Sequence, residues 1–154
     1  MTNDPITVLH VDDEPEVLEV TQWFLEREDE RLRVHTATRV RRAMATLDSV
    51  DPDCIVSDYD MPAMDGRQFF FAVRRRHGPV PFVLYTGERV EALVEEVATW
   101  RPSGYVEKGV GPAQYETLAR QIIDAVEGRR DRGTAARPTD RAADRRGRIA
   151  DDDD

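Results

Sequence analysis

The chain has 154 residues, enough for one domain with a substantial core and too few for two domains of ordinary size. Its net charge of −9 argues against a general nucleic-acid-binding surface, and no apolar stretch approaches the roughly 18 residues of a transmembrane helix. The N-terminus lacks the basic and apolar pattern of a secretion signal, so we expect a soluble, cytoplasmic protein without a membrane partner.

The charge and the apolar residues are unevenly distributed along the chain. Residues 128–154 contain eight Arg and seven Asp, a net charge of +1. Because the whole chain carries −9, residues 1–127 carry a net charge of −10. Because the C-terminal segment has too few apolar residues to offset the entropy of ordering it, we expect one domain over 5–127 and a disordered, charged tail over 128–154. Lys108 is the only lysine in the chain, which otherwise uses arginine.

The first part of the chain predicts a strand, a helix, a strand and a helix. Ile6–Val11 is an apolar, β-branched run of strand length that ends abruptly at two aspartates. Pro15 suits the first turn of the helix that follows, whose apolar positions recur at helical spacing over 17–25. Leu32–Thr36 is less apolar and is predicted to be a second strand near the sheet edge, before a second helix over 40–50.

The next segment predicts the central strand of the sheet. Residues 54–56 are apolar without alternation, as in a strand that is buried on both faces, and Asp58 follows where this strand ends. The single cysteine, Cys54, excludes an internal disulfide and is predicted to be a buried, inert thiol. Asp65 and Gln68 fit a capping box that begins the third helix.

The remaining strands and helices complete the pattern. Phe82–Tyr85 and Gly104–Glu107 are predicted strands, and apolar positions over 90–97 and 115–126 indicate the helices that follow them. Five strand-then-helix units predict an α/β fold with a doubly wound, five-stranded parallel sheet and helices on both faces. We expect the common strand order 2-1-3-4-5.

Polar residues follow four of the five predicted strands. All these strand ends point the same way in a parallel sheet, and in the expected order the first and third strands are neighbours. Three converging carboxylates need a cation, and oxygen ligands of this kind suit Mg²⁺. Phosphoryl transfer to a carboxylate would use such a site, with an ammonium and a hydroxyl to bind phosphoryl oxygens. The residues are Asp12, Asp13, Asp58, Thr86 and Lys108.

At these positions the chain resembles the receiver domain of two-component response regulators. The resemblance covers roughly residues 5–127 and implies a flavodoxin-like fold. The residues that carry it are VDDEP at 11–15, SDYDMPAMDG at 57–66, LYTG at 84–87, and Tyr105 with Lys108.

The resemblance implies a role for each of these residues. Asp58 would be the phosphoacceptor, while Lys108 and Thr86 would bind the phosphoryl oxygens. Mg²⁺ would be held by Asp12, Asp13, Asp58 and the backbone carbonyl of Asp60.

The resemblance also implies a switch and shows one departure from the family. Tyr105 resembles the aromatic residue that turns inward when Thr86 moves toward the phosphate. The positions of Asp60 and Glu88 tune phosphate loss in this family. Gly109 stands where the family usually has proline after the lysine, often across a cis bond, so we expect a trans or more mobile loop at Lys108.

Simpler structural roles compete with these assignments. Asp12 and Asp13 could cap the first helix, because acidic residues favour helix N-termini. Thr86 alone would be a turn residue, and Tyr105 could be an ordinary aromatic of an edge strand. The Asp60 side chain could be only a turn former.

We therefore expect a stand-alone response regulator receiver that is not a conventional enzyme but takes part in its own phosphorylation and dephosphorylation. A sensor histidine kinase would phosphorylate Asp58 in a phosphorelay and so change the binding of an output protein that the sequence does not identify, with homodimerisation as a further outcome. Nucleic acid is not an expected partner. The alternatives are an aspartyl-phosphate phosphatase of the haloacid dehalogenase type, since Asp58 and Asp60 mimic its DxD motif, and a pseudo-receiver that binds partners without phosphate.

Overall fold

Strands and helices alternate along the part of the chain that the computed structural model describes, residues 4–136. The strands are β1 (Ile6–Val11), β2 (Leu32–Ala37), β3 (Cys54–Ser57), β4 (Phe82–Thr86) and β5 (Gly104–Glu107). The helices are α1 (Pro15–Glu28), α2 (Val40–Val50), α3 (Gly66–His77), α4 (Val90–Trp100) and α5 (Ala113–Ala136).

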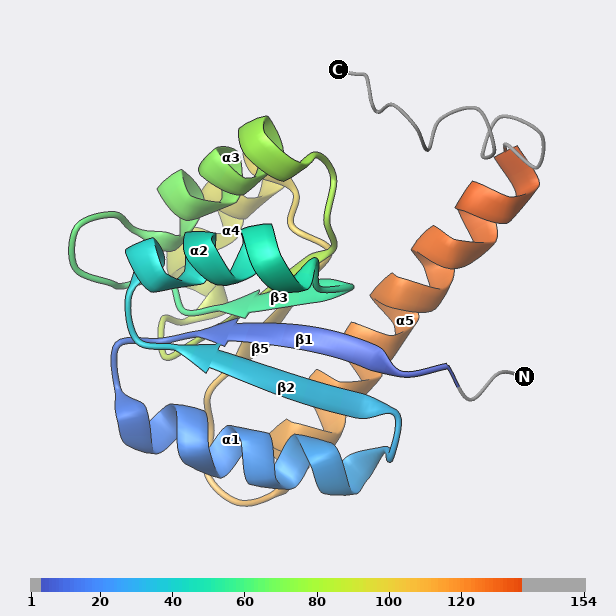
Figure 1. The fold of residues 1–154 in the computed structure, drawn as a ribbon. Helices are drawn as coiled ribbons and strands as arrows, with labels where there is room; N and C mark the ends of the chain where they lie inside the picture. The colour runs from blue at the N-terminus through green and yellow to red at the C-terminus, as the bar shows by residue number, and fades with distance from the viewer. Residues whose placement is uncertain (1–3, 137–154) are drawn as a thin grey trace.

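The strands form one parallel sheet with the order β2-β1-β3-β4-β5, which confirms the order expected from the sequence. Figure 1 shows helices on both faces of this sheet, with α1 and α5 on one face and α2, α3 and α4 on the other. The flavodoxin-like α/β fold is therefore confirmed. Within residues 4–136 no helix is both long and apolar enough to cross a bilayer.

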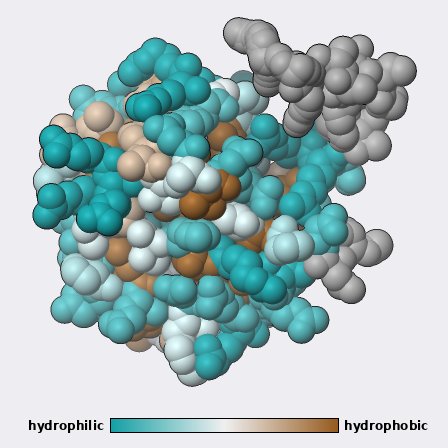
Figure 2. Space-filling model, viewed as in Figure 1, coloured by the Kyte–Doolittle hydropathy of each residue, from teal (hydrophilic) through white to brown (hydrophobic). Residues whose placement is uncertain are grey.

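The sheet is buried between two apolar layers. One layer packs β1 and β3 against α1 and α5 through residues such as Leu25 and Leu118. The other packs the opposite sheet face against α2 and α3 through residues such as Leu47 and Phe69. All four residues of β3 are buried, Cys54 among them, which explains why this strand is apolar without alternation. The outer face seen in Figure 2 is mostly hydrophilic, with a few apolar residues near its centre.

The predicted capping box at the start of α3 is present. The Asp65 carboxylate accepts a hydrogen bond from the Gln68 N–H at 2.9 Å, and the Gln68 side chain accepts one from the Asp65 N–H at 2.8 Å. These bonds satisfy two of the backbone donors that a helix N-terminus leaves free. The start of α3 is therefore fixed close to the end of β3.

Helix α5 is longer than its apolar periodicity predicts. We expected the domain to end at residue 127, whereas the helix continues to Ala136. The Arg130 guanidinium donates to the Pro5 carbonyl at 3.2 Å and lies 3.5 Å from the Asp53 carboxylate, so polar contacts support a part of the helix in which none of residues 128–132 is buried. The rest of the predicted tail, 137–154, lies outside the described residues.

Candidate functional site

The carboxyl ends of the strands lie in register at one edge of the sheet. Val11, the last residue of β1, pairs with Ser57, the last of β3, and the Asp58 N–H donates to the Val11 carbonyl at 3.1 Å. On the other side, the Lys108 N–H donates to the Thr86 carbonyl at 2.8 Å. The backbone therefore brings the polar residues that follow β1, β3 and β5 to the same edge, beside the end of β4.

Three aspartates gather at this edge. Asp12, Asp13 and Asp58 each offer a carboxylate oxygen, and these atoms lie within 4.8 Å of one another. Asp12 is fully buried and Asp58 is 8% exposed, whereas Asp13 is exposed. The convergence predicted for these three residues is therefore present, with one member open to solvent.

The only lysine of the chain extends into this cluster from the end of β5. Lys108 Nζ lies 2.7 Å from Asp12 Oδ2 and 3.3 Å from Asp58 Oδ2. Its side chain is 20% exposed, so both ion pairs are shielded from solvent more than a surface pair would be. One ammonium thus bridges the carboxylates that follow β1 and β3.

Burial and charge act in opposite directions on this pair. Burial alone would lower the pKa of Lys108, but the hydrogen bond that Lys108 donates to Asp12 and the charges of Asp58 and Asp12 raise that pKa above its ordinary value of 10.5. Burial raises the pKa of Asp12 above 3.8, and the hydrogen bond that Asp12 accepts from Lys108 offsets this only in part. Lys108 therefore stays charged, while the ionised form of Asp12 is costly to the fold.

Backbone donors orient the two buried carboxylates. Asp12 Oδ1 accepts the Glu14 N–H at 2.9 Å, and Asp58 Oδ1 accepts the Tyr59 N–H at 2.7 Å. In each residue the second oxygen is the one nearer Lys108. Each aspartate is thus held with one oxygen toward its own loop and one toward the ammonium.

Thr86 and Tyr105 are linked through the loop after β4. The Thr86 hydroxyl accepts the Glu88 N–H at 3.3 Å, and the Tyr105 hydroxyl donates to the Glu88 carbonyl at 2.9 Å. Thr86 is buried and Tyr105 is half-buried. A displacement of Thr86 would therefore disturb the loop on which the Tyr105 hydroxyl rests.

Asp60 does not join the cluster of three carboxylates. Its exposed side chain lies by Glu88, and a hydrogen bond with Asp60 raises the pKa of the Glu88 carboxyl. The expected role of the Asp60 backbone carbonyl as a metal ligand stays a prediction. The contact places the two residues expected to tune phosphate loss next to each other.

Gln114, which was not among the predicted site residues, organises the loop after β5. Its side-chain amide forms hydrogen bonds with the backbone of Gly109 and Gly111 and with the Tyr85 hydroxyl. All peptide bonds among the described residues are trans, and that includes the bond from Lys108 to Gly109. A single glutamine at the start of a helix carries little signal in a sequence, because its partners are backbone atoms of a loop.

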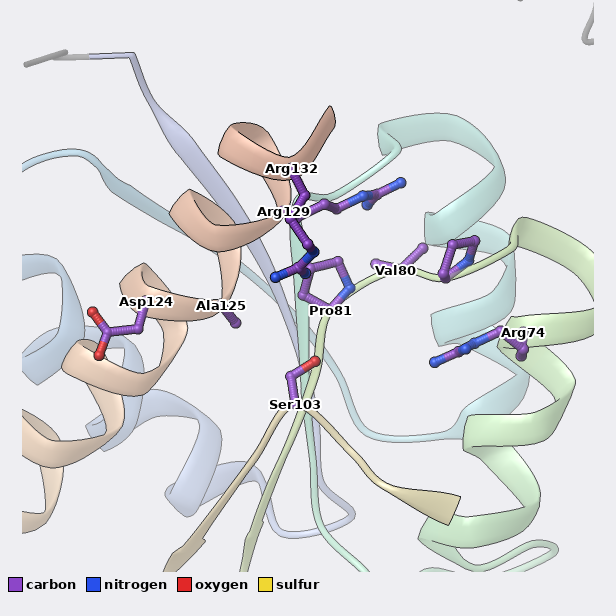
Figure 3. A pocket seen from close by; sticks show the side chains of 9 residues that line it. Arg74, Val80, Pro81, Ser103, Asp124, Ala125, Arg129 and Arg132 are labelled. Carbon is purple, nitrogen blue, oxygen red and sulfur yellow. The ribbon is translucent and has the colours of Figure 1, made fainter. Parts of the chain in front are cut away.

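A separate cavity of about 300 Å³ lies at the opposite, amino-terminal edge of the sheet. Figure 3 shows Arg129 and Arg132 on α5 and Arg74 on α3 around it, with Pro81 and Ser103 where β4 and β5 begin. None of the residues that line it belongs to the carboxylate cluster. The acidic cluster at the carboxyl ends of the strands is therefore separate from this cavity.

Comparison with known proteins agrees with this geometry. The family model of the response regulator receiver domain matches residues 8–120. Response regulator Rre1 of Synechocystis is 29% identical over 138 residues, which cover 85% of this chain and 57% of Rre1. A protein-glutamate methylesterase/protein-glutamine glutaminase of Desulfitobacterium hafniense is 30% identical over 127 residues, 80% of this chain and 32% of that protein.

Solved structures share the fold. The chemotaxis response regulator CheY4 of Vibrio cholerae has a TM-score of 0.67 and 26% identity, covering 77% of this chain and 98% of CheY4. Response regulator TrrA of Thermotoga maritima, solved in complex with Mg²⁺ and beryllofluoride, has a TM-score of 0.67 and 22% identity over 78% of this chain and 98% of TrrA. The matched part of this chain spans 57% of the length of Rre1 and 32% of the length of the methylesterase.

Proposed function

The chain belongs to the response regulator receiver domain family, and from that premise we propose that Asp58 accepts a phosphoryl group from a sensor histidine kinase in the cytoplasm and thereby switches the binding of a partner protein. Receivers of this family are signalling modules of two-component systems. The observation that carries the proposal is the position of Asp58 at the edge of the sheet where ligands bind in such folds. There its Oδ2 lies 3.3 Å from Nζ of Lys108, the only lysine of the chain.

The carboxylate cluster has the chemistry of a magnesium site. Its donors are oxygens only, as a hard divalent cation requires. The formal charges of three carboxylates and one ammonium sum to −2, which matches one divalent cation. Asp12, Asp13 and Asp58 would hold Mg²⁺, which when bound helps to neutralise the phosphoryl oxygens during transfer.

The chain's own residues account for the rest of the transfer step. An oxygen of Asp58 forms a bond to phosphorus while the bond from phosphorus to the kinase histidine nitrogen breaks, and that bond's electron pair stays on the nitrogen. Such a reaction depends mainly on in-line positioning and on neutralising the equatorial oxygens. The Lys108 ammonium and the Thr86 hydroxyl are the groups proposed to do this at two of the oxygens.

The same residues suggest how phosphorylation is sensed. A Thr86 hydroxyl that turns to a phosphoryl oxygen gives up its contact with the Glu88 N–H. The Tyr105 hydroxyl rests on the carbonyl of the same residue, so its support changes too. We propose that this coupling alters the surface around α4 and β5, where an output protein or a second copy of the chain would bind.

The family match favours this function over a phosphatase of the haloacid dehalogenase type. The contacts of Lys108 with both Asp12 and Asp58 favour it over a pseudo-receiver that works without phosphate.

Labelling with a small phosphodonor tests the assignment. Incubation with radiolabelled acetyl phosphate and Mg²⁺ should give an acid-stable, base-labile label on the wild type and none on Asp58→Asn. Asp131→Asn, at an exposed position of α5, is the matched control and should label like the wild type. Label that persists on Asp58→Asn would assign the acceptor to another residue.

A further inference from the structure

The Gln114 side chain, in the first turn of α5, uses its whole hydrogen-bonding capacity. Its Oε1 accepts the Gly109 N–H at 3.1 Å and also accepts the Tyr85 hydroxyl. Its Nε2 donates to the carbonyls of Gly109 and Gly111, each at 2.9 Å. A side-chain amide has two acceptor positions and two donors, so all four are filled.

These contacts fix a loop that is otherwise surrounded by open space at three of its residues. A Cβ atom added at Gly109 or at Gly111 would meet no atom within 4 Å, and Val110 between them is fully exposed. Glycine is the residue with the most backbone freedom to lose, so such a loop would be mobile on its own. Gln114 holds both the N–H and the C=O of Gly109, which fixes the peptide planes on either side of that residue.

The anchor of this arrangement is Tyr85. Tyr85 is 1% exposed on β4, and the centroid of its ring lies 5.8 Å from Lys108 Nζ. The Tyr85 hydroxyl connects the Gln114 amide to the core of the sheet. A continuous set of contacts therefore runs from the core through Gln114 to the residue directly after Lys108.

We propose that Gln114 is a positioning residue, which holds the loop after β5 so that the Lys108 ammonium stays against Asp12 and Asp58. Gly109 lacks the fixed φ that proline would supply here, and the amide contacts restrict the backbone instead. The kinetic consequence rests on the proposed function of Asp58. The structural consequence, the fixed position of Lys108, does not.

The single lysine allows Lys108 to be observed alone. In a sample labelled with ¹³C at lysine Cε, a fixed side chain gives two separate Hε resonances, and a mobile one gives a merged resonance. The wild type should show two resonances, whereas Gln114→Met, which keeps the side-chain length and loses all four hydrogen bonds, should show one. The Gly109 amide should also exchange with solvent faster in this variant.

Gln22→Met is the matched control. Gln22 lies on α1 and donates to the Val34 carbonyl at 3.2 Å, so this variant also loses a bond from an amide side chain to backbone, away from the site. It should keep both Lys108 resonances. Gln114→Glu, which keeps the acceptor and loses both donors, is a second variant and should also merge them.

The kinetic arm measures phosphorylation of Asp58 by acetyl phosphate. Gln114→Met should lower the maximal rate by about tenfold, while the Mg²⁺ concentration at half-maximal rate changes less than about twofold, because the carboxylates are intact. A wild type that takes no label would refute the proposed function but leave the resonance comparison valid. Two separate Lys108 resonances in both Gln114 variants, or equal slowing by Gln22→Met and Gln114→Met, would overturn the positioning role.

Discussion

At the scale of single residues, the buried Asp12 carboxylate lowers the stability of the fold when it is ionised. It is a fully buried carboxylate whose pKa is raised by burial, so the folded protein binds its proton more tightly than the unfolded chain does. Ionisation of Asp12 therefore lowers the free energy of unfolding as the pH rises from about the ordinary pKa of 3.8 through the folded pKa. We propose that Asp12 is retained for its part in the metal site and in spite of this cost to stability.

Replacement of Asp12 tests this cost. Without added Mg²⁺, Asp12→Asn should raise the free energy of unfolding at pH 7 by about 1 kcal/mol relative to the wild type. The difference in free energy of unfolding between Asp12→Asn and the wild type should disappear as the pH falls from the folded pKa of Asp12 to about 3.8, because protonated Asp12 resembles asparagine. Urea unfolding over a pH series measures it, with Asp131→Asn as the exposed control. A wild type as stable as Asp12→Asn at pH 7 would contradict the account.

At the residue scale, the sequence could predict the groups that lie at strand ends. Asp58, Asp12 and Lys108 are found by position, because parallel strands present their carboxyl ends at one edge. Gln114 could not be found this way, since its four bonds depend on the path of a loop with two glycines. The contact between Asp60 and Glu88 likewise depends on loop geometry that no periodicity encodes.

At the scale of elements, the connection from β3 to α3 depends on a close backbone approach. A Cβ atom at Gly66 would lie 2.8 Å from the Asp58 carbonyl oxygen and 3.0 Å from the Tyr59 Cα. The Gly66 N–H also donates to the Tyr59 carbonyl at 2.7 Å. A side chain here would push α3 away from the loop after β3, which contains Asp58.

Two glycine substitutions separate this effect from glycine's general flexibility. Gly66→Ala should lower the free energy of unfolding by about 1 to 3 kcal/mol, because backbone atoms cannot yield as a flexible side chain does. Gly109→Ala has open space and should change it by no more than about 0.5 kcal/mol. Chemical denaturation of both variants makes the comparison. Equal effects would show that the close approach at Gly66 is unimportant.

The boundaries of most elements could be predicted because the physical signals are strong. The strands Ile6–Val11 and Gly104–Glu107 have the predicted bounds, and the capping box at Asp65 marks the start of α3. Helix α5 was predicted too short, since none of residues 128–132 is buried and this part of the helix is supported by contacts such as that of Arg130 with Asp53. The spacing of apolar residues predicts which part of a helix is buried, but it does not predict polar contacts that extend the helix.

At the scale of the molecule, the acidic edge should couple metal binding to stability. A ligand that binds only the folded state stabilises it by about 2.7 kcal/mol at 100 times its Kd. Mg²⁺ at such a concentration should therefore raise the Tm of the wild type by several degrees at pH 7. The shift should shrink at acidic pH, because protonated carboxylates do not bind the cation.

Asp13 gives the control for this prediction, because it is the exposed member of the cluster. Asp13→Asn should lose most of the Mg²⁺-dependent rise in Tm, whereas Asp131→Asn should keep it. Thermal unfolding followed by circular dichroism at two Mg²⁺ concentrations is sufficient. An equal rise in Tm for Asp13→Asn and the wild type would place the cation elsewhere on the acidic surface.

The most direct measurement of the whole account is the set of backbone amide shifts caused by beryllofluoride with Mg²⁺, a mimic of the phosphorylated aspartate. We predict large shifts at Thr86 and Tyr105 in the wild type, and none at these residues in Asp58→Asn. The absence of shifts at Thr86 and Tyr105 in the wild type would contradict a switch that begins at Asp58. The same shifts in Asp58→Asn would also contradict it.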